Sequence, residues 1–105
     1  MSSVPVVAII KAKKNQERHL FDLLKKIVSP THQEKGCMKY GLHRSIEAPD
    51  TFVMIEKWET IESLQNHLKA PHITSAFARQ AELIENISIY PLKSIPVGLA
   101  SKEII

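Results

Sequence analysis

Four stretches of the chain have the hydrophobic patterns of β-strands. Residues 4–12 are β-branched and almost wholly apolar, which is typical of a central strand buried on both faces. Residues 37–45 and 51–58 alternate in character and are separated by the turn sequence Ala-Pro-Asp at 48–50, which predicts an antiparallel hairpin. Residues 87–92 form a last strand, and the proline within it favours an edge position.

Two regions between these strands have helical periodicity. Residues 16–28 carry one apolar stripe, with Asn15 as the expected N-cap and Pro30 as the residue that ends the helix. Thr60 is the expected N-cap of a second helix. Pro71 breaks that helix and begins a second helical piece, which we expect to run to about residue 85.

The order of these elements is β-α-β-β-α-β, which predicts an α+β fold, a ferredoxin-like sandwich with helices on one face of an antiparallel sheet. The strand at 51–58 is apolar on both faces, because Val53 and Ile55 alternate with Phe52 and Met54. The sheet face without helices must therefore bury against something. A second copy of the chain is the simplest candidate, so we expect a homodimer through the open sheet face.

Composition excludes several classes of protein. The 105 residues are 44% hydrophobic and 24% charged, which predicts one globular domain over 1–105, with its core at 4–92. The net charge of +3 comes from scattered residues, so no nucleic-acid surface is expected. No apolar run approaches the roughly 20 residues of a membrane helix, and the first ten residues lack the pattern of a secretory signal, so we expect a cytoplasmic protein.

The C-terminal tail at 93–105 is irregular but rich in apolar residues. Such a tail is expected to pack against its own domain or against a partner subunit. Its apolar residues are Ile95, Val97, Leu99, Ile104 and Ile105.

Several polar and aromatic side chains can converge between the helices and the sheet. They are Tyr40, His43, Glu56, Trp58, His67 and His72. Glu56 lies in an apolar strand, so it is either a general base with a raised pKa or the partner of a cation. The cations considered are Arg44, Lys57 and Arg79.

Metal and cofactor sites are not indicated by the spacing of ligand residues. His67 and His72 are five residues apart, which is not the i, i+4 spacing of helical metal ligands, so a three-histidine site with His43 is not required. The lone Cys37 excludes an internal disulfide and is more typical of a buried apolar residue than of a nucleophile. The chain contains no phosphate-binding glycine loop and no flavin or nicotinamide fingerprint.

Three motifs together resemble the antibiotic biosynthesis monooxygenase (ABM) domain family. They are EKGCMKY at 34–40, FVMIEKWE at 52–59 and LQNHLKAPH at 64–72, and the last two resemble the small bacterial quinol monooxygenases in particular. The resemblance covers residues 4–92. It implies a ferredoxin-like dimer of the dimeric α/β-barrel superfamily. It also implies oxidation of a quinol- or anthrone-like aromatic by molecular oxygen, without flavin, metal or haem.

The resemblance also implies roles for residues at matching positions. His67 or His43 would be the base, and Glu56 is a further catalytic candidate. The remaining candidates would bind the substrate: Tyr40, Trp58, His72 and Phe77.

Haem degradation, which some members of the superfamily carry out, is not favoured, because the first strand lacks the asparagine expected of that branch. Two other functions stay open. The superfamily also includes isomerases of a phosphorylated signalling sugar, and a small pocket with His and Glu would suit proton shuttling on a phosphorylated carbonyl compound. A non-catalytic dimer that binds a ligand is the third interpretation.

Overall fold

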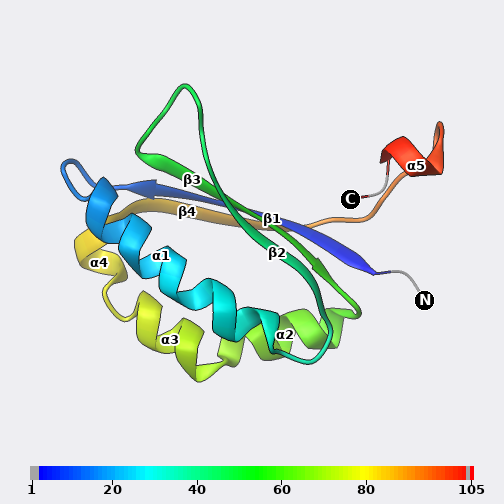
Figure 1. Ribbon diagram of the computed structural model, residues 1–105, viewed down its shortest axis with the longest axis horizontal. Helices are drawn as coiled ribbons and strands as arrows, with labels where there is room; N and C mark the ends of the chain where they lie inside the picture. Colours follow the sequence, from blue (N-terminus) through cyan, green and yellow to red (C-terminus); the bar gives the residue numbers. More distant parts are fainter. Residues whose placement is uncertain (1–2, 104) are drawn as a thin grey trace.

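The computed structural model describes residues 3–103 and 105 and contains a four-stranded antiparallel sheet in the order β2-β3-β1-β4 (Figure 1). The strands are β1 (Val4–Ala12), β2 (Cys37–Arg44), β3 (Thr51–Trp58) and β4 (Ile84–Pro91). The helices are α1 (Glu17–His32), α2 (Ile61–Lys69), α3 (Pro71–Phe77), α4 (Gln80–Leu83) and α5 (Ala100–Glu103). Helices α1 to α4 cover one face of the sheet, which confirms the ferredoxin-like α+β sandwich.

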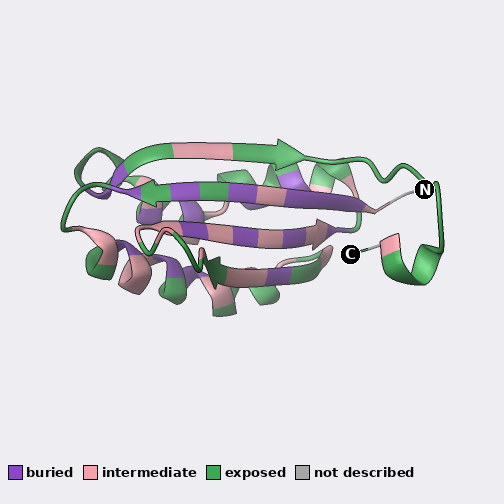
Figure 2. Ribbon diagram, turned by 90° about the horizontal axis from the view of Figure 1, so that it is seen from above, coloured by how far each residue is buried: buried purple, intermediate pink, exposed green. Residues whose placement is uncertain are grey.

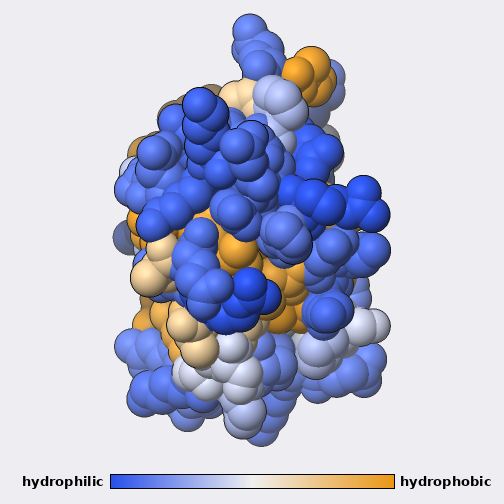
Figure 3. All heavy atoms as spheres, turned by 90° about the vertical axis from the view of Figure 1, so that its left-hand side faces the viewer, coloured by the Kyte–Doolittle hydropathy of each residue, from blue (hydrophilic) through white to orange (hydrophobic). Residues whose placement is uncertain are grey.

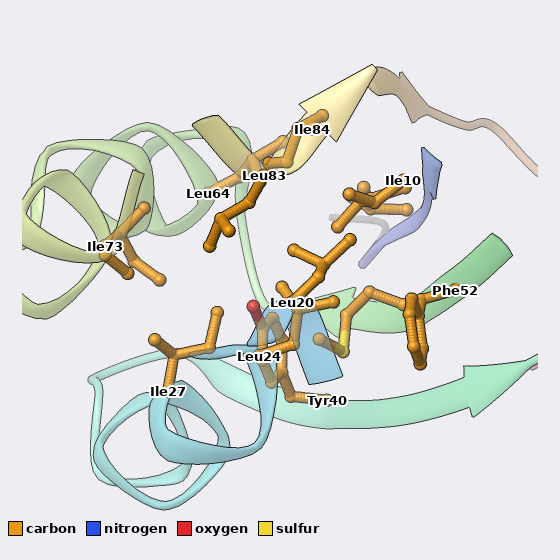
Figure 4. Packing of buried hydrophobic residues seen from close by; sticks show 14 of the residues in the cluster. Ile10, Leu20, Leu24, Ile27, Tyr40, Phe52, Leu64, Ile73, Leu83 and Ile84 are labelled. Atoms are coloured by element: carbon orange, nitrogen blue, oxygen red, sulfur yellow. The ribbon is translucent and has the colours of Figure 1, made fainter. Parts of the chain in front are cut away.

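The core lies between this helical layer and the sheet. Leu20 and Leu24 of α1 are fully buried and lie close to Ile10 of β1 and Phe52 of β3 (Figure 4). Ile10 is paired with Phe52 on one side and with Ile87 of β4 on the other, so β1 is an interior strand of the sheet, as predicted. Strand β4 is at the edge, also as predicted.

Helix α1 is longer than the sequence predicted. It continues through Pro30, although proline removes one helical hydrogen bond. Tertiary packing stabilises this last turn. Thr31 is fully buried, and His32 Nε2 lies 2.8 Å from the carbonyl oxygen of Tyr40 in β2. The expected N-cap was also wrong, because Asn15 adopts a left-handed φ of 66° in the turn before the helix.

The second half of the chain differs from the prediction between Pro71 and the last strand: the expected single helical piece is two short helices, α3 and α4, and β4 spans Ile84–Pro91 rather than 87–92. Thr60 caps α2, since its hydroxyl accepts a hydrogen bond from the Ser63 amide at 3.0 Å, and Pro71 begins α3, both as predicted. The helical piece does not reach residue 85, because β4 already begins at Ile84. Leu83 is buried and Ile84 pairs with Ala12 of β1, so the chain joins the sheet before the residue at which the strand was expected to begin.

The other face of the sheet is bare in the single chain. Val7 is half-buried and Ile9 is exposed, so the expected burial of β1 on both faces is not met by the chain alone (Figure 2). The tail residues Ile95, Val97 and Leu99 are also largely exposed, and Ile104 lies outside the described residues.

No helix in residues 3–103 has the length and apolar character needed to cross a membrane.

Hydrophobic surface is visible at the end of the molecule that carries α4 and the β1–α1 turn, where hydrophilic residues surround it (Figure 3).

Candidate functional site

A cavity of about 290 Å³ lies between the helices and the sheet. This volume is at the lower end of the range for small-molecule sites, so it suits a small ligand. No lysine or arginine is among its lining residues, and its walls are mainly apolar. The sheet contributes Ala8, Ile10, Tyr40, Met54, Glu56, Ile87 and Ile89, and the helical layer contributes Ile27, Leu64, His67, Leu68, Ile73, Thr74, Phe77 and Gln80.

Glu56 is a buried acid on the sheet wall of this cavity. It is only 5% exposed, and its Oε1 accepts a hydrogen bond from Trp58 Nε1 at 2.8 Å. Burial raises the pKa of Glu56 to about 7, the Trp58 hydrogen bond opposes this rise, and the charge of Glu34 adds to it. Glu56 therefore exchanges a proton near neutral pH.

The alternative of an ion pair for Glu56 is wrong. Lys57 is adjacent on β3 and so points to the opposite face of the sheet. Arg44 lies over the ring of Phe52, 4.7 Å from its centroid. Arg79 pairs instead with Glu82 at 3.3 Å.

His67 faces the cavity from α2 and is held by a carboxylate behind it. Its Nδ1 lies 2.7 Å from Oε2 of Glu34, and His72 Nε2 lies 2.8 Å from the same oxygen. Because a carboxylate only accepts hydrogen bonds, both nitrogens donate. The Thr31 hydroxyl lies 3.2 Å from His72 Nε2 and completes the cluster.

The loop before β2 brings Glu34 to the histidines. Gly36 has a φ of +86°, and a Cβ atom there would lie 2.1 Å from Oγ of Ser63 in α2. Only glycine tolerates this backbone and this close approach, so the loop packs tightly against α2. The sequence motif at 34–40 contained Glu34, but nothing in its spacing predicted a contact with His67 or His72.

The hydrogen bond from Nδ1 to Glu34 determines which ring nitrogen of His67 can accept a proton. His67 is 3% exposed; burial lowers its pKa, and the hydrogen bond and charge of Glu34 oppose this change. The neutral ring therefore carries its proton on Nδ1 and a lone pair on Nε2. Nε2 has no hydrogen-bond partner among the described side chains and is not fully buried, so it is the ring nitrogen left free for a ligand of the cavity that His67 lines.

Aromatic rings fix the orientation of His67. The Trp58 ring lies 4.6 Å from it and the Tyr40 ring 5.2 Å, measured between centroids. Tyr40 lines the cavity, and burial, helped by the charge of Glu56, raises the pKa of its phenol well above the usual value. Tyr40 is therefore a neutral donor at any physiological pH.

The sequence candidates form two groups at or beside the cavity, and His43 lies apart from both. Glu56, His67, Tyr40 and Phe77 line the cavity. Trp58 and His72 do not line the cavity but contact residues next to it. Trp58 donates a hydrogen bond to Glu56, and His72 donates one to Glu34.

His43 and Cys37 do not join this arrangement. His43 is exposed on the bare side of the sheet, where it pairs with Val53 and its Nδ1 lies 3.1 Å from the carbonyl oxygen of Gly41. Among the described residues, His43 therefore does not join His67 and His72 in a three-histidine site. Cys37 is half-buried, and burial, with the charges of Glu34 and Glu56, raises the pKa of its thiol. A protonated thiol is a poor nucleophile.

Known proteins resemble this chain in sequence and in fold. Residues 3–79 match a family model described as "Antibiotic biosynthesis monooxygenase". The Escherichia coli K12 protein "Probable quinol monooxygenase YgiN" is 36% identical over 78 residues, which covers 65% of this chain and 75% of that protein. The structure of PA3566 from Pseudomonas aeruginosa has a TM-score of 0.87 at 26% identity and covers 91% of this chain and 97% of that one. Rv0793 from Mycobacterium tuberculosis has a TM-score of 0.82 at 27% identity, over 94% and 99% of the two chains.

Proposed function

The chain belongs to the antibiotic biosynthesis monooxygenase family, and we propose that it oxidises a small quinol- or anthrone-like aromatic with molecular oxygen and without a bound cofactor. The observation that supports this proposal is that His67 lines an apolar cavity while its Nδ1 is hydrogen-bonded to Glu34. The name of the YgiN relative supports the substrate class.

His67 and Glu56 divide the proton transfers between them. His67 Nε2 takes the phenolic proton, and the electron-rich anion reduces oxygen and forms a carbon–oxygen bond, which gives a peroxide. Glu56, with a pKa of about 7, donates a proton to the peroxide and later recovers one from His67. Loss of water then leaves a new carbonyl, so one oxygen atom enters the product, the other becomes water, and a quinol becomes a hydroxyquinone.

The residues that line the cavity would orient the substrate and keep water away from it. The apolar lining excludes water that would protonate the anion, and the neutral Tyr40 ring, whose hydroxyl interacts with Thr31, forms part of the wall. A flat substrate would lie between the side chains of Ile73 and Phe77 on the helical wall and Met54 on the sheet wall.

The isomerase alternative lacks an anion site. A phosphorylated substrate needs a cationic partner for its phosphate. No lysine or arginine lines the cavity, Arg44 is placed over aromatic rings, and Arg79 is paired with Glu82. These contacts favour a neutral aromatic ligand over a sugar phosphate.

The bare sheet face supports a homodimer as part of this proposal. Val7, Ile9, Val53 and Ile55 pair across β1 and β3 on the side away from the helices, and Tyr90 extends this apolar area onto β4. Light scattering at micromolar concentration should give twice the chain mass of 11.9 kDa. A mass of 11.9 kDa would exclude this assembly.

Oxygen uptake tests the proposed activity. Purified protein is mixed with a panel of quinols and with anthrone, and oxygen consumption is compared with the rate without protein. We expect acceleration with at least one substrate and its loss in His67→Ala. Tight ligand binding without uptake would instead support a non-catalytic binding dimer, and proton exchange into a phosphorylated ketose would support the isomerase.

A further inference from the structure

We propose that Glu34, His67 and His72 form a binding site for a divalent transition-metal ion of the zinc type, and that an ion bound there switches off His67 as a base. The three residues come from the loop before β2, from α2 and from α3. Two imidazoles and one carboxylate are a ligand set that such ions take in proteins.

The donor atoms are already close together. His67 Nδ1, His72 Nε2 and a carboxylate oxygen of Glu34 all lie within 4.8 Å of one another. The two histidine nitrogens are 2.7 and 2.8 Å from Glu34 Oε2. Ligands about 2.0–2.1 Å from a tetrahedral ion are roughly 3.3 Å apart. Binding therefore requires each nitrogen to move about half an ångström away from Glu34 Oε2, while the two nitrogens, which lie within 4.8 Å of each other, adjust to the same separation.

The charges around the cluster favour a cation. Glu34 has no lysine or arginine partner among the ion pairs of the described residues; its partners are the two histidines. A divalent ion would supply positive charge that two neutral imidazoles do not provide.

The cluster is also accessible from outside. The side chains of His72 and Glu34 are 24% and 15% exposed, whereas that of His67 is 4% exposed. An ion can therefore enter past His72 without passing through the cavity. Three protein ligands leave a fourth position for water, as in open zinc sites.

A metal at this site would reverse the roles of the two His67 nitrogens. An ion on Nδ1 uses that lone pair, so the proton of the neutral ring must lie on Nε2, the nitrogen left free for a ligand of the cavity. The ring would then be a donor toward the cavity and could not accept a proton there. The loss of catalysis rests on the proposed function, whereas binding and the change of tautomer do not.

Binding is tested on the full chain after treatment with a chelator. Calorimetry with zinc chloride should show one ion per chain, and Co²⁺ should give the visible bands of a four- or five-coordinate ion without a thiolate ligand. Glu34→Gln and His72→Asn should each weaken binding by at least about tenfold. His19→Asn, which replaces an exposed histidine, and Cys37→Ser should bind as the parent does.

The tautomer is measured separately by long-range ¹H–¹⁵N NMR of the histidine rings. We expect the His67 proton on Nδ1 without metal and on Nε2 with zinc; a proton on Nδ1 in both states would overturn the switch. Absence of binding by the parent, or binding by folded Glu34→Gln and His72→Asn with parental affinity, would overturn the site. The Co²⁺ spectrum of the parent gives this answer even if a variant fails to fold, because sulfur ligation or an octahedral spectrum would contradict the proposed ligands. These measurements do not use the oxygen reaction, so they can fail or succeed independently of the monooxygenase proposal.

Discussion

Replacing Glu56 with glutamine should change how the stability of the protein depends on pH. Burial raises the pKa of Glu56 from its ordinary 4.5 to about 7 in the folded protein. Between these two pH values the folded protein holds a proton that the unfolded chain has released, so the free energy of unfolding falls as pH rises through this range. The rise in pKa corresponds to about 3 kcal/mol, at roughly 1.4 kcal/mol for each pKa unit.

Glutamine is a matched replacement because its amide oxygen can still accept the hydrogen bond from Trp58 Nε1. Glu56→Gln should therefore have a free energy of unfolding similar to the parent near pH 4.5. Above pH 7, where the parent must keep a buried carboxylate charged, the variant should be more stable by up to about 3 kcal/mol.

The assay is urea denaturation of both proteins from pH 4.5 to 8.5 at one protein concentration, since an oligomer's stability depends on concentration. The difference between variant and parent cancels most other titrating groups. A difference that stays constant across this range would refute the raised pKa of Glu56, and with it the role of this residue as a proton donor near neutral pH.

Three other expectations concern different parts of the molecule. His67→Ala should reduce quinol-dependent oxygen uptake by about 10²–10⁴-fold, the usual contribution of a general base, whereas the exposed His19→Ala should retain the parental rate; equal rates for both would contradict the base. Gly36→Ala should lower the free energy of unfolding by about 1–3 kcal/mol because of its positive φ and the contact with Ser63, and urea denaturation with no change would show that the loop can shift freely. Ile55→Lys places a charge in the bare sheet face and should give the monomer mass in light scattering, while a persistent dimer would place the interface elsewhere.

The strand segments followed from the sequence because the pattern of apolar residues records which faces are buried. Thr51–Trp58 was predicted to the residue, and Val4–Ala12 likewise. Local signals failed where tertiary contacts outweighed them. Pro30 did not end α1, because burial of Thr31 and the contact of His32 with β2 hold the last turn.

The candidate site was only partly readable for a similar reason. Glu56, His67, Tyr40 and Phe77 were expected at the pocket, and all four line the cavity. The partner of His67 was missed because Glu34 lies 33 residues away in the chain, and no local pattern encodes that contact. His43 looked equivalent to His67 in the sequence, but strand alternation places it on the opposite face of the sheet.

The central claim is that this protein inserts one atom of molecular oxygen into an aromatic substrate with His67 as the base and without a bound cofactor. The most direct measurement is mass spectrometry of the product formed by chelator-treated protein under oxygen gas enriched in the heavy isotope. We expect one heavy oxygen atom in each product molecule, and loss of this product in His67→Ala. Product that carries only oxygen from water, or labelled product formed equally fast by His67→Ala, would contradict the account.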